Sequence, residues 1–374
     1  MTMARSKLVD ESKSGVFHLV NRCVRRGFLL GHECDHRRDW LQEQLRAKTA
    51  IFAIDVLAYA IMDNHFHLII KTQPERAADW DEMEVARRWT TLCPPKDLRG
   101  QPVRLKPDEL QALIAQPGWV KERRRRLSSM SWLMKLIKEK LARQANREDK
   151  VTGHFWEGRF HSVPLLDPAA VLAGMVYVDL NPIRAGVAQT PEESDHTSVQ
   201  ERILLMEEAK LPRRLRRAGL QEAGRSTDET RPDEAYGDSR HLREMCGEVL
   251  RRKARRGIKP WVAPIKDCAP GATGECGLTL EQYLTLVDQT ARQLRPGKRG
   301  AMDRHAADIL ERLGLDGGKW IEAMARGGQF RGRAVGSPEA RTQHLVQRGG
   351  GEKWIADKTP IYAESDAPGA TAGP

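Results

Sequence analysis

Two histidines one residue apart are the first feature of this chain that could do chemistry. They lie in "MDNHFHLIIK", where His65 and His67 flank Phe66. Alternate side chains of a β-strand face the same way, so both imidazoles would project from one face and Phe66 from the other, into a core. Neutral imidazole binds Mn²⁺ and Zn²⁺, and it can serve a Mg²⁺ site that oxygens complete. The alternative is two histidines that only make local hydrogen bonds.

A second candidate group lies in "VYVDLNP", where Tyr177 and Asn181 are four residues apart. On a helix this spacing places both side chains on one face. A tyrosine in such a place is usually a packed aromatic whose hydroxyl is hydrogen-bonded. The alternative makes Tyr177 a nucleophile and lets Asn181 offer an amide oxygen to a metal. Two imidazoles and one amide oxygen would leave coordination positions open, and a phosphate oxygen could fill one.

The surrounding segments predict the elements that would position these side chains. "DPAAVLAGMVYVDLNP" predicts a helix with Asp167 as N-cap and Pro168 at the first helical position. It should stop at Asn181, because a residue before proline is pushed out of the helical region. Another helix should begin after Asp35, and Ser128 or Ser129 should cap a third. The predicted strands are residues 16–20, a segment within 51–62, 65–71 after a turn at 63–64, and 159–166.

The order strand, helix, strand, strand, helix, strand, helix predicts an α+β fold. It matches a ferredoxin-like antiparallel sheet with packed helices, although an α+β sandwich with another strand order stays open. Residues 75–120 look like an insertion with one helix, and residues 201–240 like a charged linker. We expect residues 241–365 to form a basic, mainly helical C-terminal extension and residues 366–374 a disordered tail.

Composition narrows the class of partner. The 374 residues carry a formal net charge of +11, which favours a polyanion. Nucleic acid is the commonest such partner, and an anionic membrane surface is the rival. The six cysteines form no CxxC pair, which argues against a zinc ribbon. No apolar run approaches the roughly 18 residues of a membrane span, so we expect a cytoplasmic protein without membrane segments.

Four stretches, taken in order, resemble the single-tyrosine HUH transposases, named for histidine, bulky hydrophobe, histidine. The nearest branch is the REP-associated tyrosine transposases. The resemblance spans residues 12–200, departs in length at the insertion, and does not cover the region after residue 200. The stretches are "YAIMDNHFHLIIKT", "LSSMSWLMKLIKEKLAR", "GHFWEGRFHSVPLLD" and "VYVDLNPIRAGV".

This resemblance implies a catalytic domain over residues 12–200 with a ferredoxin-like sheet. It implies that His65 and His67 bind Mg²⁺ or Mn²⁺ and that Tyr177 attacks a phosphate of single-stranded DNA. Asn181 stands where the family places its third metal ligand. Metal-dependent DNA cleavage and strand transfer through a 5′-phosphotyrosine, on hairpin-forming DNA and by a homodimer, would follow.

Two other functions stay open. The chain could be a non-catalytic DNA-binding regulator that kept the fold, and such a protein should lose nothing on Tyr177→Phe. It could also be a relaxase or replication-initiator type of HUH nickase. Those enzymes commonly carry additional tyrosines or a helicase, whereas this chain has one well-placed tyrosine.

Basic and aromatic residues near these motifs are candidates for contact with DNA. Arginines would bind phosphates, and an aromatic ring would stack on unpaired bases. The alternatives are a solvated basic face, aromatic residues that belong to the core, and compensation of charge at a helix C-terminus. The candidates are Arg123, Arg124, Arg125, Arg126, Trp156, Arg159 and Arg184.

Overall fold

The computed structural model describes most of the first 210 residues and several segments after them. Among these residues no helix is both long enough and apolar enough to cross a membrane. The described residues are 10–210, 261–265, 277–294, 304–312, 315–326, 330, 334–348 and 361.

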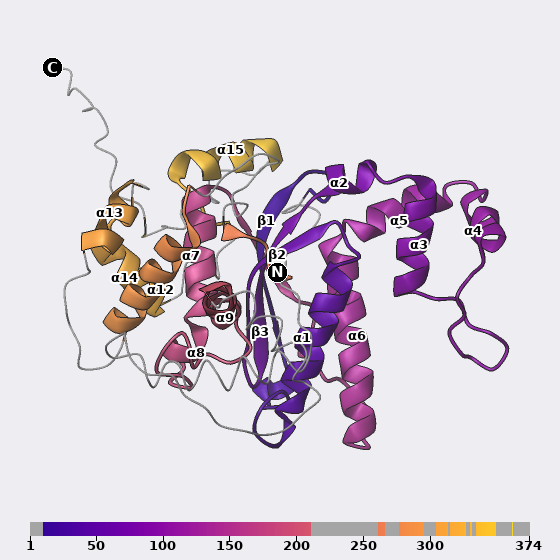
Figure 1. Ribbon diagram of the computed structural model, residues 1–374, viewed down its shortest axis with the longest axis horizontal. Coiled ribbons are helices and arrows are strands. Elements are labelled where there is room, and N and C mark those ends of the chain that lie inside the picture. The colour runs from indigo at the N-terminus through magenta and orange to yellow at the C-terminus, as the bar shows by residue number, and fades with distance from the viewer. Residues whose placement is uncertain are drawn as a thin grey trace.

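A four-stranded antiparallel sheet forms the centre of the described part (Figure 1). Its order is β2-β3-β1-β4, which confirms an α+β fold built on an antiparallel sheet. The predicted tight turn is confirmed as well, because the Met62 amide donates to the His65 carbonyl at 2.8 Å across residues 63–64. The strands are β1 (Gly15–Arg22), β2 (Ile54–Ile61), β3 (His65–Thr72) and β4 (His161–Leu165).

The strand register collects histidines on one face of this sheet. Val20 of β1 lies opposite His67 of β3 on one side and His161 of β4 on the other. Residues that lie directly opposite each other point to the same face, and so do residues two apart in one strand. His18, His65, His67 and His161 therefore all project from the same face.

Helices α1 (His36–Thr49) and α6 (Met130–Glu148) cover the other face (Figure 1). The apolar side chains of that face, such as Leu19 and Phe66, form one buried cluster with both helices. Ser129 caps α6 by accepting from the Trp132 amide at 3.4 Å. The sequence had predicted that either Ser128 or Ser129 would be this cap.

Helix α7 (Pro168–Asp179) covers the face that carries the histidines. Asp167 accepts from the Ala170 amide at 2.8 Å, which confirms the predicted N-cap. Gly174 lets this helix approach the sheet closely, since a Cβ at that position would lie 2.9 Å from Leu165 and 3.3 Å from Ile69.

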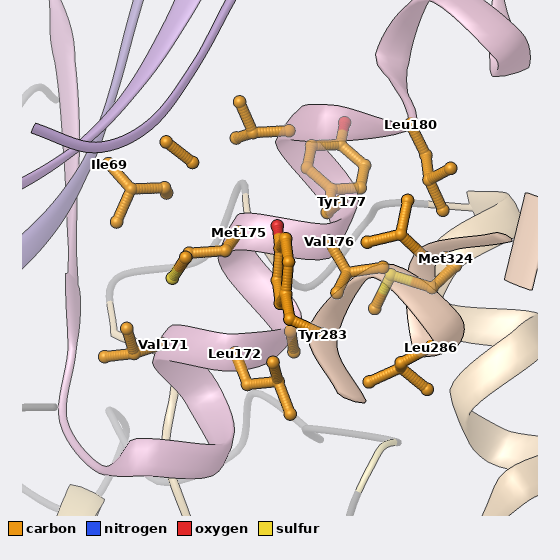
Figure 2. Packing of buried hydrophobic residues seen from close by; sticks show 14 of the residues in the cluster. Ile69, Val171, Leu172, Met175, Val176, Tyr177, Leu180, Tyr283, Leu286 and Met324 are labelled. Carbon is orange, nitrogen blue, oxygen red and sulfur yellow. The ribbon is translucent and has the colours of Figure 1, made fainter. Parts of the chain in front are cut away.

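Further helices pack behind α7, so that it is buried on all sides (Figure 2). One apolar cluster joins the sheet, α7 and side chains such as Leu286 and Trp320 from the C-terminal part. Thr279 and Gln282 cap the start of the first C-terminal helix by reciprocal hydrogen bonds at 3.0 and 3.2 Å. The helices are α9 (Ser198–Lys210), α12 (Leu280–Leu294), α13 (Arg304–Arg312), α14 (Gly317–Arg326) and, at one end, α15 (Pro338–Arg348).

The predicted insertion differs most from the sequence-based expectation. One helix was expected over residues 75–120, but this stretch, all of it described, contains two helices and overlaps two more at its ends. The helices are α2 (Pro74–Ala78), α3 (Glu82–Leu92), α4 (Pro107–Ile114) and α5 (Trp119–Leu127). Three of these helices, α3, α4 and α5, enclose a small core of their own around Trp89 and Trp119, and the basic run of residues 121–126, which precedes α6, is itself helical within α5.

Three local predictions are wrong. Asp35 does not cap α1, because its own backbone is helical (φ −54°, ψ −35°) after the short turns η2 (Val24–Arg26) and η3 (His32–Cys34). Helix α7 ends at Asp179, since Leu180 leaves the helical region (ψ 2°), and Asn181 opens α8 (Asn181–Arg184). The first ten residues of the expected linker belong to α9, and residues 211–240 and 366–374 lie outside the described residues.

Candidate active site on helix α7

The predicted histidines and tyrosine come together between the sheet and α7. The ring centroids of His65 and His67 are 4.9 Å apart, with their planes at 74°. The Tyr177 ring stands edge-on to His67 at 5.9 Å. Strand β3 supplies the two imidazoles from one face, and α7 presents Tyr177 to that face in its last turn.

His18 is a third imidazole that sequence reasoning missed. Its Nε2 lies 2.8 Å from His67 Nδ1, and the two rings stack at 5.1 Å. It also lies 6.0 Å from the Tyr177 ring. A single histidine in "VFHLV" carries no motif, and only the pairing of β1 with β3 brings it to His67. We call His18, His65, His67, Tyr177 and Asn181 the histidine cluster.

Asn181 joins this cluster one turn beyond the tyrosine. Its Nδ2 donates to the Tyr177 carbonyl at 3.1 Å, so the four-residue spacing still brings the two residues together across the break between α7 and α8. Asn181 is buried. Because the amide nitrogen is used by the carbonyl, its Oδ1 is the atom left to accept.

The Tyr177 ring is enclosed, but no residue that the structure describes uses its hydroxyl. Phe330 packs on the ring at 4.5 Å, and the Arg184 guanidinium lies 4.5 Å from its centroid while donating to the Ala325 carbonyl at 3.1 Å. Only 5% of Tyr177 is exposed. Among the described residues none is hydrogen-bonded to its hydroxyl, which points away from the apolar side chains around α7 in Figure 2.

Burial keeps the imidazoles neutral. It lowers the pKa of His18 to about 3, with a smaller opposing effect from the Phe330 carbonyl. Burial, and then the charge of Arg22, lowers the pKa of His65 to about 4. The pKa of His67 falls well below its ordinary value through burial and its histidine neighbours. At neutral pH each ring therefore has one N–H donor and one lone pair.

These residues suit a weakly held divalent cation. No group of three His, Cys, Asp or Glu side chains with metal-binding geometry occurs in the described part of the chain. The available donors are two imidazoles and one amide oxygen, all uncharged. With metal–nitrogen bonds of about 2.1 Å, the rings of two imidazoles on one ion lie roughly 5 Å apart, as those of His65 and His67 do. Oxygen ligands from a substrate would have to complete the coordination.

The arginines at 123–126 all have partners within the protein. Arg124 donates to the carbonyls of Ala78 and Trp80 at 3.0 and 2.9 Å. Arg125 and Arg126 pair with Glu122 and lower the pKa of that carboxyl to about 2. Arg123 and Arg126 also lie over tryptophan rings, at 4.9 Å from Trp119 and 4.2 Å from Trp132 respectively. These contacts hold the insertion together.

The remaining DNA-binding candidates lie in different surroundings. Trp156 is buried on the α6 face, where its ring meets Phe66 at 5.5 Å and its indole N–H donates to the Lys138 carbonyl at 3.0 Å. This position suits the core alternative rather than base stacking. Arg159 is exposed. Arg184 is half-buried and lies over the Tyr177 ring, beside the histidine cluster.

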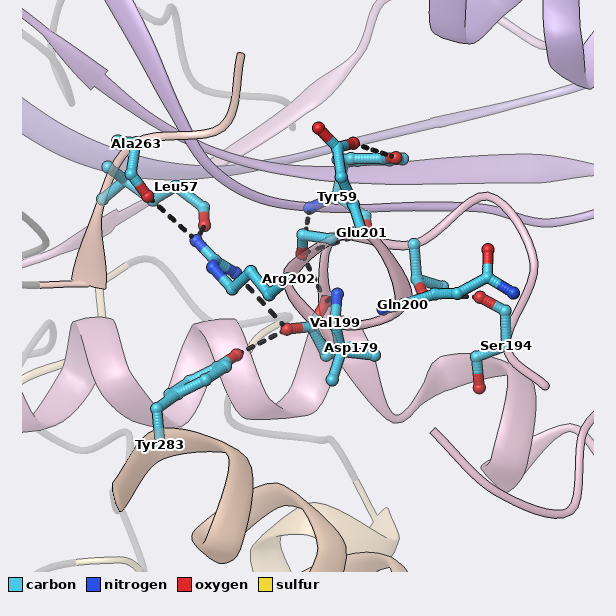
Figure 3. A network of polar contacts seen from close by, with 12 residues as sticks. Leu57, Tyr59, Asp179, Ser194, Val199, Gln200, Glu201, Arg202, Ala263 and Tyr283 are labelled. Carbon is cyan, nitrogen blue, oxygen red and sulfur yellow. Dashed lines mark hydrogen bonds and ion pairs between the residues drawn. The ribbon is translucent and has the colours of Figure 1, made fainter. Parts of the chain in front are cut away.

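A second polar cluster is centred on Asp179, which is two residues after Tyr177 on α7 (Figure 3). Asp179 accepts from Ser198 Oγ, from the Val199 amide at 3.0 Å and from the Tyr283 hydroxyl at 2.5 Å. Arg202 lies 3.7 Å from the same carboxylate. Burial raises the pKa of Asp179, and Arg202 opposes that shift most strongly. We call Asp179, Ser198, Arg202 and Tyr283 the Asp179 cluster.

Comparison with known proteins adds little. No protein-family model matches the sequence, and no curated protein matches it. Among solved structures the chain is similar to a REP-associated tyrosine transposase bound to a REP hairpin. That match has 12% identity and a TM-score of 0.33, and it covers 54% of this chain and 86% of the other. A TM-score this low does not establish a shared fold.

Proposed function

We propose that this protein cleaves and rejoins single-stranded DNA through a 5′-phosphotyrosine on Tyr177, with Mg²⁺ or Mn²⁺ as cofactor. The observation that carries the proposal is the meeting of Tyr177 with His65, His67 and Asn181 at one end of α7. These are the residues to which the motif resemblance assigns the nucleophile and the metal ligands. They come from two segments about 110 residues apart in the sequence, and the fold brings them within one cluster.

The chain's own residues would divide the work. Tyr177 Oη attacks the phosphorus, and Arg184 and Phe330 hold the ring on either side. Arg22 and Arg184 provide positive charge beside the histidines, which attracts the phosphate. A divalent cation held by His65, His67 and Asn181 would polarise a non-bridging phosphate oxygen and make the phosphorus more electrophilic.

The step conserves the number of phosphodiester bonds. The bond from Tyr177 Oη to phosphorus forms while the bond from phosphorus to the 3′-oxygen breaks. The phenolic proton passes to solvent, and the departing 3′-oxygen becomes a hydroxyl. Attack by another 3′-hydroxyl on the phosphotyrosine reverses the step and joins strands, so that no nucleoside triphosphate is required.

The arrangement of the sheet supports the ferredoxin-like part of the proposal. Two strand–helix–strand units, β1-α1-β2 and β3-α6-β4, interleave in the order β2-β3-β1-β4, and both crossover helices lie on one face. We propose that residues 12–200 form the catalytic domain, that hairpin-forming DNA is the partner, that the protein acts in the cytoplasm, and that it works as a homodimer.

One observation favours a second function, a non-catalytic DNA-binding regulator. Phe330 covers the Tyr177 ring, which is only 5% exposed, whereas a nucleophile must reach a DNA phosphate. In that case the histidine cluster would serve only to pack α7 on the sheet.

A covalent-adduct assay separates the two. The full-length protein is incubated with a labelled library of single-stranded hairpins and Mn²⁺, beside Tyr177→Phe, His65→Ala and the control Tyr283→Phe. We expect a protein–DNA adduct that survives a denaturing gel in the wild type and in the control alone. Tight binding of hairpins by all four proteins without any adduct would establish the regulator and refute the enzyme.

A further inference from the structure

His18 has no part in the motifs, yet it lies within hydrogen-bond distance of a candidate metal ligand. It is 1% exposed, and its Nε2 lies 2.8 Å from His67 Nδ1. Placing a second imidazole in an apolar core costs free energy unless its polar atoms are paired. We therefore ask what the contact between His18 and His67 does. The answer depends on which of the two rings carries the proton between them.

Two tautomers are compatible with the distance. If His18 Nε2–H donated, its own Nδ1 would hold a buried lone pair, and no described residue offers that atom a hydrogen bond. The nearby backbone group is the Phe330 carbonyl, which favours a proton on His18 instead of a lone pair. If His67 Nδ1–H donates, His18 Nδ1–H faces that carbonyl. The second arrangement is favoured because it turns an N–H, rather than a lone pair, toward the carbonyl oxygen, although that nitrogen is not within hydrogen-bond range of any described residue.

His65 has the same arrangement with a different partner. Its Nδ1 lies 2.6 Å from Asn64 Oδ1. The orientation of that amide is fixed, because Asn64 Nδ2 donates to the Arg26 carbonyl at 3.1 Å. An amide oxygen can only accept, so His65 Nδ1 must carry the proton.

From these contacts we infer that His18 and Asn64 are positioning residues that hold His67 and His65 with their Nε2 lone pairs free to bind one divalent cation. The inference deepens the proposed function and rests on it. A ligand histidine usually donates its other N–H to such an acceptor, which fixes the tautomer and the ring orientation and makes the bound nitrogen more basic.

The contact with His67 also excludes His18 as a third ligand through Nε2, since that nitrogen is already the acceptor. The inference thus keeps two imidazoles at the cation and assigns the third to orientation. It predicts different effects for three histidines on one face of the sheet: His67 binds, His18 orients, and exposed His161 does neither.

A direct test reads the tautomers in the metal-free, full-length protein. Selective ¹⁵N labelling of histidine and long-range ¹H–¹⁵N spectra distinguish protonated from unprotonated ring nitrogens. We expect Nδ1–H on both His65 and His67. A proton on Nε2 of His67 would overturn the inference whether or not the protein forms a DNA adduct. The expected tautomers without any adduct would refute the enzyme instead.

Mn²⁺ binding gives the second readout. The unbound ion is followed by electron paramagnetic resonance in the presence of a hairpin oligonucleotide. His18→Phe keeps the size of the ring but removes the acceptor, so Mn²⁺ affinity should fall about 10- to 100-fold. His18→Gln, whose amide oxygen can replace the lost acceptor, should restore most of that loss, and His161→Ala should change nothing. Wild-type affinity in a folded His18→Phe protein would contradict the assignment.

Discussion

Tyr177 and Asp179 are two residues apart on α7 and belong to two buried polar clusters. In the Asp179 cluster each carboxylate oxygen accepts hydrogen bonds from α9 or α12. Arg202, beside this carboxylate, donates to the Leu57 and Ala263 carbonyls. In the histidine cluster the Tyr177 hydroxyl has no hydrogen bond to any described residue, and the inferred tautomers leave two imidazole lone pairs free.

The difference indicates which cluster could do chemistry. Tyr283 and Tyr59 each bond a carboxylate through the hydroxyl, and for Tyr59 burial raises the pKa well above the ordinary value. Such groups hold α9 and α12 in place and have nothing left to offer a substrate. Of the two clusters, the one around Tyr177 has a tyrosine hydroxyl that no described residue uses, so it is the one that could act on a substrate.

Removing the charge at the centre of the Asp179 cluster should have the largest effect on stability. In Asp179→Ala, Arg202 would remain buried without its carboxylate, and the free energy of unfolding should fall by about 3–5 kcal/mol. Chemical denaturation of the variant measures this. Asp288→Ala, which breaks an exposed pair with Arg292, is the matched control and should cost no more than about 1 kcal/mol. Equal losses would mean that the cluster is not structural.

Acid should weaken the histidine cluster next. The unfolded chain binds a proton on histidine near pH 6.5, but the pKa of folded His18 is about 3, so the unfolded state holds more protons between these values. The free energy of unfolding should therefore fall as pH is lowered below about 6.5, by roughly 3 kcal/mol at pH 4 from His18 alone. Denaturation curves at pH 7, 5 and 4 measure the slope. His18→Gln should reduce the dependence of the free energy of unfolding on pH, whereas His161→Ala should leave it unchanged.

Tyr177 of α7 and Tyr283 of α12 should respond in opposite ways to the loss of the hydroxyl group. Tyr283→Phe leaves Asp179 short of one donor and should cost about 1–3 kcal/mol of stability. Tyr177→Phe should change stability by less than about 0.5 kcal/mol, since no described residue bonds its hydroxyl. Thermal denaturation and the adduct assay, run on the same samples, should show opposite results for the two variants. Loss of stability in Tyr177→Phe would mean that its hydroxyl is a structural group.

The smallest expected effect concerns the cation. Uncharged ligands next to Arg22 and Arg184 should hold Mn²⁺ weakly until a phosphate arrives, so a bound hairpin should raise Mn²⁺ affinity at least about 5-fold. Titration with and without the oligonucleotide measures this coupling. The same affinity in both would indicate a complete metal site elsewhere in the chain.

Local patterns predicted the elements near the site well. The Asp167–Pro168 start of α7, the turn at residues 63–64 and the common face of His65 and His67 depend only on neighbouring residues. Each is governed by short-range rules of capping, turn formation and strand alternation, and those rules held in the structure.

What the sequence could not supply was long-range pairing. His18 meets His67 only because β1 lies between β3 and β4, and no spacing along the chain encodes that order. Trp156 was a candidate for base stacking, yet the fold turns it into the α6 core. Only one insertion helix was predicted, and the others escaped prediction because their core forms from residues far apart in sequence, such as Trp89 and Trp119.

The burial of α7 on all sides has a consequence for synthesis on the ribosome. The helix needs Leu286, Trp320 and Met324 to cover its back, and these are translated long after Asp179. At about 5–20 residues per second, roughly 7–30 s separate the two ends of that core. Nascent chains would carry the helix with an uncovered apolar side throughout that interval. The uncovered side of α7 should therefore be the place where chaperones bind the nascent chain. A chain that terminates before Leu286 would keep this side exposed.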